Sequence, residues 1–254
     1  MFYKLPTTQR KSVSTVGGLI DIEMTKLAQH LEEHKEEYKR WLVDNEQGRI
    51  DIKILPYLKN IENGFFVEAG ALDGLFMSNT KILEDLGWDG LLIEPSYEAC
   101  KKCVENRKAT VVRGALVSNN YKEDKIYGDF WFDGTEGKGA WSSVNRNRAS
   151  SQKMVYVPAM TLSDVLRTFN VKKVDLLSLD VEGYELNALK GLDFNEFEVT
   201  YILVEVNTRD YDLEDVDELL RKHGYKNLGC LSNFSVETNE GWDGSHQDYL
   251  YARP

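Results

Sequence analysis

The sequence has few cysteines, a deficit of basic residues and no long apolar run, and each scarcity excludes a class of protein. Its three cysteines, Cys100, Cys103 and Cys230, are too few and of the wrong parity for a disulfide framework, so we expect reduced thiols. The 31 Lys and Arg against 42 Asp and Glu give a net charge of −11, which opposes binding to nucleic acid through counterion release. No apolar run approaches roughly eighteen residues, and the N-terminus lacks a signal-peptide pattern. We therefore expect a soluble, cytoplasmic protein that binds neither nucleic acid nor membrane.

Residues 1–62 are expected to form an N-terminal arm and helical extension. Residues 1–21 are polar and have no sustained period, which favours an irregular arm. From Ile22 to Val43, apolar residues recur at spacings of three and four, which predicts an amphipathic helix. This helix would cover the core, fold over a substrate cleft or form a homodimer contact. A second short helix is expected from Ile50 to Ile61.

Residues 63–254 alternate apolar runs with helical patterns, which predicts one α/β domain with a parallel sheet covered on both faces. Residues 119–157 interrupt this alternation with an aromatic, glycine-rich insertion, expected to lie near the substrate side or to form a surface hairpin. The expected strands are FFVEAG, GLLIEP, TVVRGALVS, VDLLSLDVEG, VTYILVEVN, YKNLGCLS and QDYLYAR, of which the last two would form a hairpin that completes the sheet.

The strongest local pattern is FVEAGALDG, residues 66–74, in which an apolar strand runs into a glycine turn. Gly70 allows a close approach of the backbone to a ligand, but the turn lacks the third glycine of the dinucleotide fingerprint. Glu94 ends the next strand, about twenty residues later, where a carboxylate accepts hydrogen bonds from ribose hydroxyls. The pair indicates an adenosine ligand with free ribose hydroxyls, either S-adenosylmethionine or NAD. The incomplete glycine pattern favours S-adenosylmethionine, which has no phosphate to bind.

Acidic side chains also follow two later strands. Asp180 and Glu182 come at the end of LLSLDVEG, and Glu205 lies in LVEVN, so all three would reach the ligand-binding edge of the sheet. Asp180, Glu182 or the imidazole of His246, expected in the loop before the last strand, is a candidate general base. Alternatively, Asp180, Glu182 and Glu205 would bind a divalent cation such as Mg²⁺. A third interpretation makes Asp180 the cap of the following helix.

Two further patterns each allow a functional and a structural interpretation. Cys100 and Cys103 have the C-x-x-C spacing of zinc ligands, but no second pair of ligands follows, which favours core cysteines on a helix. The aromatic residues of the insertion would form either a stacking platform for a pyranose ring or the core of a hairpin. They are Tyr127, Phe130, Trp131 and Trp141.

The motifs FVEAGALDG, SNT, GLLIEP, TLSDVL, DLLSLDVEGYELNALKGL and LVEVN together resemble the FkbM-type methyltransferase family, over roughly residues 64–207. The resemblance implies a Rossmann-like class I methyltransferase fold: a mostly parallel seven-stranded sheet with helices on both faces and a last antiparallel strand. It implies S-adenosylmethionine as methyl donor and O-methylation of a hydroxyl group, most of all on a carbohydrate or glycan, with a small molecule or glycan as acceptor. The alternatives are an NAD-dependent oxidoreductase and a non-catalytic nucleotide-binding module.

The resemblance also implies roles for individual residues. Glu68, Gly70 and Asp73 would line the methionine end of the cofactor, and Glu94 would hold its ribose. The implied cofactor-binding set is Glu68, Gly70, Ala71, Asp73, Ser78, Asn79, Glu94, Pro95, Ala115, Leu116 and Asp180.

The remaining implied roles concern the adenine and the transferred methyl group. Ala115 and Leu116 would flank the adenine. Asp180 and Glu182 would face the methyl group, which would make them, with His246, the candidate catalytic residues.

Overall fold

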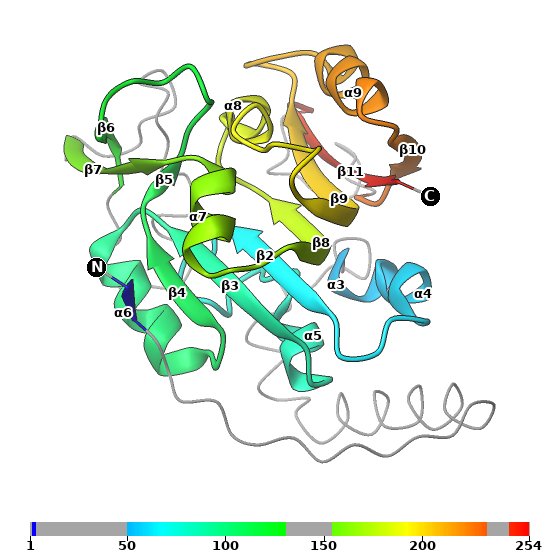
Figure 1. Cartoon of the computed structure of the whole chain (residues 1–254), viewed down its shortest axis with the longest axis horizontal. Helices are drawn as coiled ribbons and strands as arrows, with labels where there is room; N and C mark the ends of the chain where they lie inside the picture. Colours follow the sequence, from blue (N-terminus) through cyan, green and yellow to red (C-terminus); the bar gives the residue numbers. More distant parts are fainter. Residues whose placement is uncertain (1, 4–49, 131–153, 233–243, 254) are drawn as a thin grey trace.

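The computed structural model describes residues 2–3, 50–130, 154–232 and 244–253 (Figure 1). The helix predicted at residues 22–43 lies outside this part of the chain, together with the homodimer contact expected of it. Trp131 and Trp141 of the insertion also lie outside it. Within the described residues, no helix has both the length and the apolar character needed to cross a membrane.

The described residues form a mostly parallel sheet. Its strands are β1 (Phe2–Tyr3), β2 (Phe65–Ala69), β3 (Asp89–Glu94), β4 (Thr110–Arg113), β8 (Lys173–Leu179), β9 (Glu198–Asn207), β10 (Lys226–Cys230) and β11 (His246–Ala252). Their order across the sheet is β1-β4-β3-β2-β8-β9-β11-β10, and β11 runs antiparallel to both of its neighbours. The predicted Rossmann-like sheet of seven strands with an antiparallel last strand is confirmed, and β1 adds an eighth.

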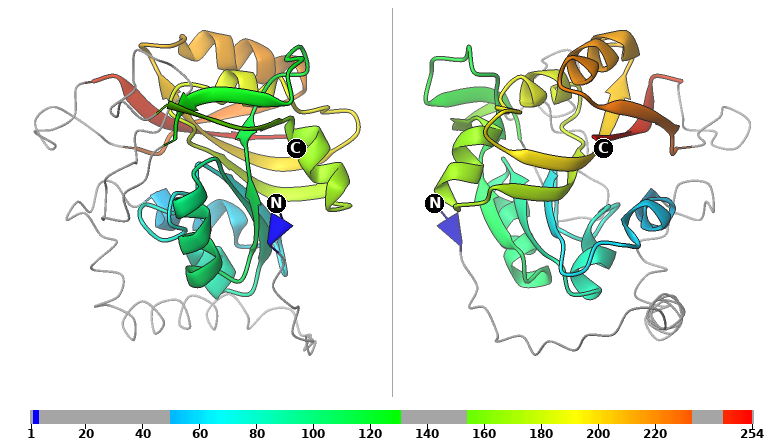
Figure 2. Two further views of the ribbon diagram at one scale, coloured as in Figure 1. Left: turned by 90° about the vertical axis from the view of Figure 1, so that its left-hand side faces the viewer. Right: turned by 45° about the vertical axis from the view of Figure 1, so that its right-hand side comes forward.

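Helices cover both faces of the sheet, as Figure 2 shows from two directions. Successive residues of a strand point to opposite faces, so Val67 packs with one layer of helices and Phe66 with the other. The first layer contains α7 (Leu162–Thr168), α8 (Glu185–Leu189) and α9 (Leu213–Lys222). The second contains α3 (Ile50–Lys53), α4 (Leu55–Leu58), α5 (Lys81–Asp85) and α6 (Tyr97–Asn106). Burial on both faces explains why the strand sequences are continuously apolar.

Two parts of the predicted N-terminal extension belong to the main fold. The helix expected over residues 50–61 is divided into α3 and α4 because Pro56 has no backbone N–H and its ring crowds the preceding turn. Ile54 and Leu58 of this segment are buried in the sheet's second layer. β1, which falls in the predicted irregular arm, pairs with β4 and covers backbone groups that would otherwise form an exposed sheet edge.

Helix α6 carries the two closely spaced cysteines. The Ser96 hydroxyl accepts a hydrogen bond from the backbone N–H of Ala99 and so caps the helix. Cys100 and Cys103 are fully buried, and the Cys103 thiol donates to the Leu72 carbonyl at 3.1 Å. Burial raises the pKa of the Cys103 thiol well above its ordinary value. The prediction of core cysteines on a helix is therefore confirmed.

The strand ends are aligned at one edge of the sheet. Ala69 at the end of β2 pairs with Ile93 on one side and with Leu179 on the other. Leu179 pairs in turn with Val204 of β9. The residues that follow these positions therefore share one edge, where ligands of open α/β sheets bind.

The described part of the insertion forms a small second sheet beside this edge. β6 (Lys125–Asp129) and β7 (Met154–Met160) make an antiparallel pair, and β7 also pairs in parallel with β5 (Ala115–Leu116). Ile126, Phe130 and Val157 are buried between these elements. The described part of the insertion thus consists of short strands, and they place Phe130 next to the end of the main sheet.

Candidate active site

A pocket opens at the aligned strand ends. Glu94 of β3 and Glu205 of β9 come from separate strands, and Phe130 follows the second sheet. The lining is formed by Glu68, Ala69, Gly70, Ala71, Leu72, Phe76, Met77, Ser78, Asn79, Ile93, Glu94, Pro95, Gly114, Ala115, Leu116, Phe130, Ser178, Asp180, Val181, Glu182, Tyr184, Glu205 and His246.

This lining contains all the residues expected from the sequence at the cofactor and catalytic positions, except Asp73. Asp73 is buried, and its Oδ1 accepts hydrogen bonds from the backbone N–H groups of Leu75 and Phe76, at 2.9 and 2.8 Å. Short acidic side chains commonly fix a turn in this way. Asp73 is therefore outside the pocket lining and fixes the loop that carries Phe76.

The packing of the protein itself requires a glycine at position 70. Its φ of +85° lies in the left-handed region, and a Cβ atom there would come within 1.7 Å of the Asp180 carbonyl oxygen. Its N–H donates to the Ile93 carbonyl at 3.0 Å. The glycine thus allows the ends of three strands to meet, which refines the sequence-based interpretation of a close approach to a ligand alone.

The pocket also concentrates left-handed backbone at residues with large side chains. Leu72, Met77 and Glu182 have φ values of +47°, +54° and +57°, and all three line the pocket. The other non-glycine residues with positive φ in the described chain are asparagines, which tolerate this region well. Backbone conformations of this kind cost free energy and cluster at functional sites.

Glu94 has the geometry expected of a ribose-binding carboxylate. One oxygen accepts from the backbone N–H of Leu72 at 3.0 Å, and the other accepts from the N–H of Ser96 at 2.7 Å. Each carboxylate oxygen has two acceptor sites, so both can accept a further hydrogen bond. Burial, with the nearby charge of Asp73, raises the pKa of Glu94 to about 7 despite the two backbone bonds. Proton loss near neutral pH therefore produces the acceptor that ribose hydroxyls need.

Glu68 has protein partners at both carboxylate oxygens. Its acceptor contacts include the hydroxyls of Ser78 and Thr80 and the backbone N–H of Asn79, at 2.7 to 3.1 Å. Arg107 adds a longer contact at 3.4 Å. These donors use most of the acceptor capacity of the carboxylate, so Glu68 fixes the Ser78–Thr80 wall of the pocket that it also lines.

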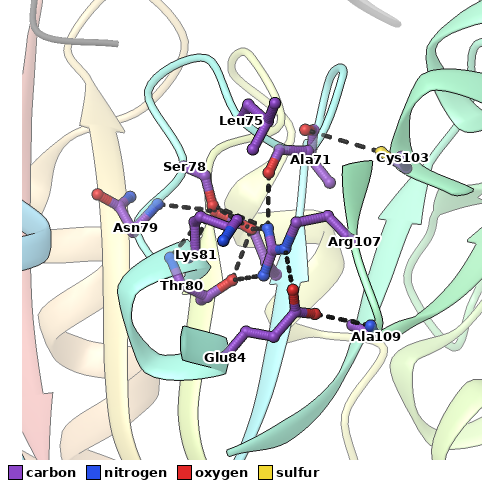
Figure 3. A network of polar contacts seen from close by, with 12 residues as sticks. Ala71, Leu75, Ser78, Asn79, Thr80, Lys81, Glu84, Cys103, Arg107 and Ala109 are labelled. Atoms are coloured by element: carbon purple, nitrogen blue, oxygen red, sulfur yellow. Dashed lines mark hydrogen bonds and ion pairs between the residues drawn. The ribbon is translucent and has the colours of Figure 1, made fainter. Parts of the chain in front are cut away.

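The Arg107 side chain donates hydrogen bonds to this wall, at the hydroxyls of Ser78 and Thr80 (Figure 3). The guanidinium is fully buried and donates to Glu84 at 3.2 Å, to the Gly74 carbonyl at 2.8 Å and to the Thr80 hydroxyl at 3.0 Å. Glu84 also accepts from the backbone N–H groups of residues 108 and 109. A buried guanidinium shared between two carboxylates neutralises charges that would otherwise be very costly inside the fold.

A cluster of carboxylates forms the other side of the pocket. Since Leu179 pairs with Val204, Asp180 and Glu205 follow side by side. Oxygen atoms of Asp180, Glu205 and Glu185 all lie within 4.8 Å of one another, and this is the group of potential cation ligands that the described residues contain. The expected set contained Glu182 in place of Glu185 and is corrected on this point.

The local backbone explains why Glu185, and not Glu182, belongs to the cluster. Glu182 and Gly183 both have left-handed φ, so the chain turns sharply before α8. The N–H groups of Val181 and Gly183 then donate to Glu185 Oε1, at 2.8 and 3.1 Å. The turn therefore encloses the Glu185 carboxylate, whereas the cap position of α8 is Tyr184. Asp180 does not occupy that position, so the capping interpretation is wrong.

The environment of this cluster disfavours the ionised form of its own carboxyl groups. Burial raises the pKa of Glu205 well above its ordinary value, and the charges of Asp180, Glu185, Glu182 and Asp248 raise it further. Burial likewise raises the pKa of Glu185, although Tyr211 and three backbone contacts oppose the shift. Burial raises the pKa of Asp248, which pairs with Glu205 across the sheet, to about 7. The cluster therefore has a strong affinity for protons or for another positive charge.

His246 and the aromatic residues complete the lining. His246 is the first residue of β11 and not a loop residue, and it reaches the pocket from the strand beside β9. Phe130 is almost fully buried, and both Phe130 and Tyr184 line the pocket. Tyr127 is instead exposed and packs against Tyr156, with ring centroids 4.8 Å apart. Of the described aromatics of the insertion, Phe130 therefore belongs both to the core of the small sheet and to the pocket wall, whereas Tyr127 belongs to neither.

These features define a Rossmann-like α/β domain with a pocket at the ends of its parallel strands, in which Glu94 lies beside an acidic cluster. The sequence profile of the methyltransferase FkbM domain matches residues 68–226, more than half of the chain. The chain belongs to this family. It is therefore an S-adenosylmethionine-dependent methyltransferase, which replaces the alternative of an NAD-dependent oxidoreductase.

Comparison with solved structures gives distant likenesses among methyltransferases. A TehB-like S-adenosylmethionine-dependent methyltransferase from Corynebacterium glutamicum is 11% identical, with 89% of this chain and 100% of that chain covered and a TM-score of 0.44. A second S-adenosylmethionine-dependent methyltransferase, from Clostridium acetobutylicum, is 10% identical, with 91% and 98% covered and a TM-score of 0.44. The 1,6-didemethyltoxoflavin-N1-methyltransferase from Burkholderia thailandensis is 11% identical, with 95% and 92% covered and a TM-score of 0.41. Comparison with curated proteins found no significant match.

Two residues of the site had no distinct role in the sequence-based interpretation. Glu185 lies in the same motif as Asp180 and Glu182, three residues after the latter, and this third acid is the signal that marks it. Arg107 carries no comparable signal, because it follows a helix of mixed charge. Its importance comes only from burial beside Glu68 and Glu84.

Proposed function

We propose that this methyltransferase transfers the methyl group to a hydroxyl oxygen of a carbohydrate or glycan. The observation that supports this most is the presence, in one pocket, of a ribose-type carboxylate and several groups able to accept a proton. Asp180, Glu182, Glu205 and His246 all line the pocket that contains Glu94. A hydroxyl must lose its proton as its oxygen attacks a methyl carbon, so a positioned base is needed.

The residues present fit S-adenosylmethionine, which supplies an electrophilic methyl group on a sulfonium. Glu94 would accept hydrogen bonds from the ribose hydroxyls through the acceptor sites that Leu72 and Ser96 leave open. Ala115 and Leu116 offer buried apolar surface for the adenine. Holding both reactants in line is the protein's main contribution, which reaches about 7–11 kcal/mol in well-oriented reactions.

The acidic cluster would receive the acceptor proton. Asp180 follows β8 directly and lines the pocket, which makes it our first choice as general base. Glu205 is a further candidate that the structure adds, because its raised pKa makes its carboxylate a stronger base.

The apolar part of the pocket suits the ring of a sugar acceptor. Phe130 and Tyr184 present aromatic surface there, and the carbon–hydrogen face of a sugar ring packs well on aromatic rings. The surrounding carboxylates would accept hydrogen bonds from the sugar's other hydroxyls. The two features together suit a molecule with one apolar face and several hydroxyl groups.

A labelled-methyl transfer assay with a panel of sugars, glycans and amines tests the proposal. We expect a product heavier by one methyl group, with the label on oxygen. Asp180→Asn should lower turnover by a factor of about 100 or more, the usual contribution of a general base, and leave S-adenosylhomocysteine affinity within about threefold. Asp164→Asn, at an exposed position of α7, is the matched control. Transfer to nitrogen or carbon would contradict the proposal. Cofactor binding without transfer to any acceptor would instead favour a non-catalytic module.

A further inference from the structure

The three carboxylates of the acidic cluster come from separate parts of the chain. Asp180 follows β8, Glu185 begins α8 and Glu205 lies in β9, yet their nearest oxygens are within 4.8 Å of one another. Hard divalent cations bind carboxylate oxygens at about 2.0–2.6 Å, so two ligands on opposite sides of one cation are separated by about 4–5 Å. The spacing of the three oxygens is therefore that of a coordination shell.

Glu205 supplies an independent indication of a missing ligand. Its side chain is 8% exposed, and its buried Oε2 atom has no hydrogen-bond partner among the described residues. Buried polar atoms in folded proteins nearly always have a partner, and those without one point to an unrecorded water, ion or ligand. This atom belongs to the carboxylate that reaches the cluster.

Glu185 is oriented as metal-binding carboxylates usually are. Val181 and Gly183 donate to Oε1, and the Tyr211 hydroxyl lies 2.6 Å from Oε2. The same hydroxyl lies 2.7 Å from the Glu205 carbonyl oxygen, which ties the two acidic residues together. Outer hydrogen bonds of this kind fix the direction of a ligand and leave an acceptor site on Oε2 open.

We propose that Asp180, Glu185 and Glu205 bind a hard divalent cation of the Mg²⁺ or Mn²⁺ class at the acceptor end of the pocket. The cation replaces the mutual repulsion of the three carboxylates with attraction. Its role in the reaction rests on the proposed function: there it would hold the acceptor oxygen and favour loss of the hydroxyl proton. With Asp180 and Glu205 bound to the cation, the proton would pass to Glu182 or His246, which line the same pocket.

A competing occupant is the sulfonium of S-adenosylmethionine, which is itself a cation. The two can be separated because S-adenosylhomocysteine has no sulfonium charge, whereas Mn²⁺ binds without any cofactor. Titration of the full chain with Mn²⁺, followed by electron paramagnetic resonance, therefore tests the site directly. It is run without cofactor and again with S-adenosylhomocysteine.

We expect the wild-type chain to bind one Mn²⁺ and Mg²⁺ to displace it. Glu205→Gln, which keeps the side-chain shape, should weaken Mn²⁺ at least tenfold. Glu198→Gln, at the exposed opposite end of the same strand, should leave it unchanged. Mn²⁺ should raise the melting temperature of the wild-type chain and leave that of Glu205→Gln unaltered. Asp180→Asn is a second variant with the same expected loss, in case Glu205→Gln does not fold.

Two results would overturn the cation site. One is the absence of Mn²⁺ binding at millimolar concentration, with or without S-adenosylhomocysteine. The other is equal binding by wild type and both cluster variants. If S-adenosylmethionine alone stabilises the wild type and Mn²⁺ does not bind, the cluster serves the sulfonium. Mn²⁺ binding without methyl transfer to any hydroxyl would preserve the site and refute the proposed function, so the two failures are distinguishable.

Discussion

The ribose contact proposed for Glu94 predicts that cofactor affinity changes with pH, and this change can be measured. Its carboxyl is buried and has a pKa of about 7, and only the ionised form can accept two ribose hydroxyls. The ionised fraction is about 0.09 at about pH 6 and about 0.91 at about pH 8. Because apparent affinity scales with the competent fraction, S-adenosylhomocysteine should bind about tenfold more tightly at the higher pH.

Replacing Glu94 with glutamine removes both the charge and the titration. Two charge-assisted hydrogen bonds become neutral ones, a loss of about 1 kcal/mol each, so affinity near pH 8 should fall about thirtyfold. The tenfold dependence on pH should disappear. Glu105→Gln, on the exposed side of α6, is the control and should behave as the wild type does.

The same shift in pKa predicts a change in stability with pH. Burial raises the pKa of Glu94 from 4.5 to about 7, so the unfolded chain loses this proton first as pH rises. The contribution of Glu94 to stability is therefore complete below about pH 4.5 and decreases until about pH 7. The decrease is about 3 kcal/mol, at 1.36 kcal/mol per unit. Glu94→Gln should remove this part of the slope, although it loses one backbone hydrogen bond at every pH.

Isothermal titration across this pH range and urea unfolding at the same pH values measure the two effects. An affinity that does not change between about pH 6 and about pH 8 would refute the role of Glu94 as the titrating ribose acceptor. A tenfold dependence that persists in Glu94→Gln would refute it equally, since another group, such as His246, would then be responsible.

Two further variants test the architecture around the pocket by urea unfolding. Gly70→Ala places a Cβ against the Asp180 carbonyl and should lower the free energy of unfolding by at least about 2 kcal/mol more than Gly87→Ala does, because Gly87 also has a positive φ but nothing within 4 Å. Equal losses for the two variants would contradict the close packing of the strand ends. Arg107→Lys loses the planar set of donors to Glu84, Gly74 and Thr80 and should destabilise the fold by about 3–5 kcal/mol. The control Arg167→Lys, at an exposed ion pair, should destabilise it by less than about 1 kcal/mol. A similarly small loss for both variants would show that the Arg107 network does not hold the pocket wall.

The local pattern of the sequence was sufficient to predict the fold. Continuous apolar runs such as LLIEP and ILVEV predict strands buried on both faces, because only a parallel sheet between two helical layers excludes water from every side chain. The turn at Gly70 and the acid at Glu94 marked the pocket at the sheet edge, because both depend on their position at a strand end. The division of the helix at Pro56 follows from a local property of proline that the expected single helix did not take into account. The strand β1 was not predicted, because its pairing with β4 is a tertiary contact.

The roles of individual acids were beyond the reach of the sequence. Glu68 and Asp73 belong to the same motif as Gly70, yet their oxygens bind the protein's own loops, because those loops fold back over them. Glu182 and Glu185 are three residues apart, and two left-handed residues decide which of them enters the cluster. A strand end fixes where a carboxylate arises along the chain. Only the tertiary structure fixes which donors and charges surround it, and those surroundings determine whether it binds the cofactor, a cation or the protein itself.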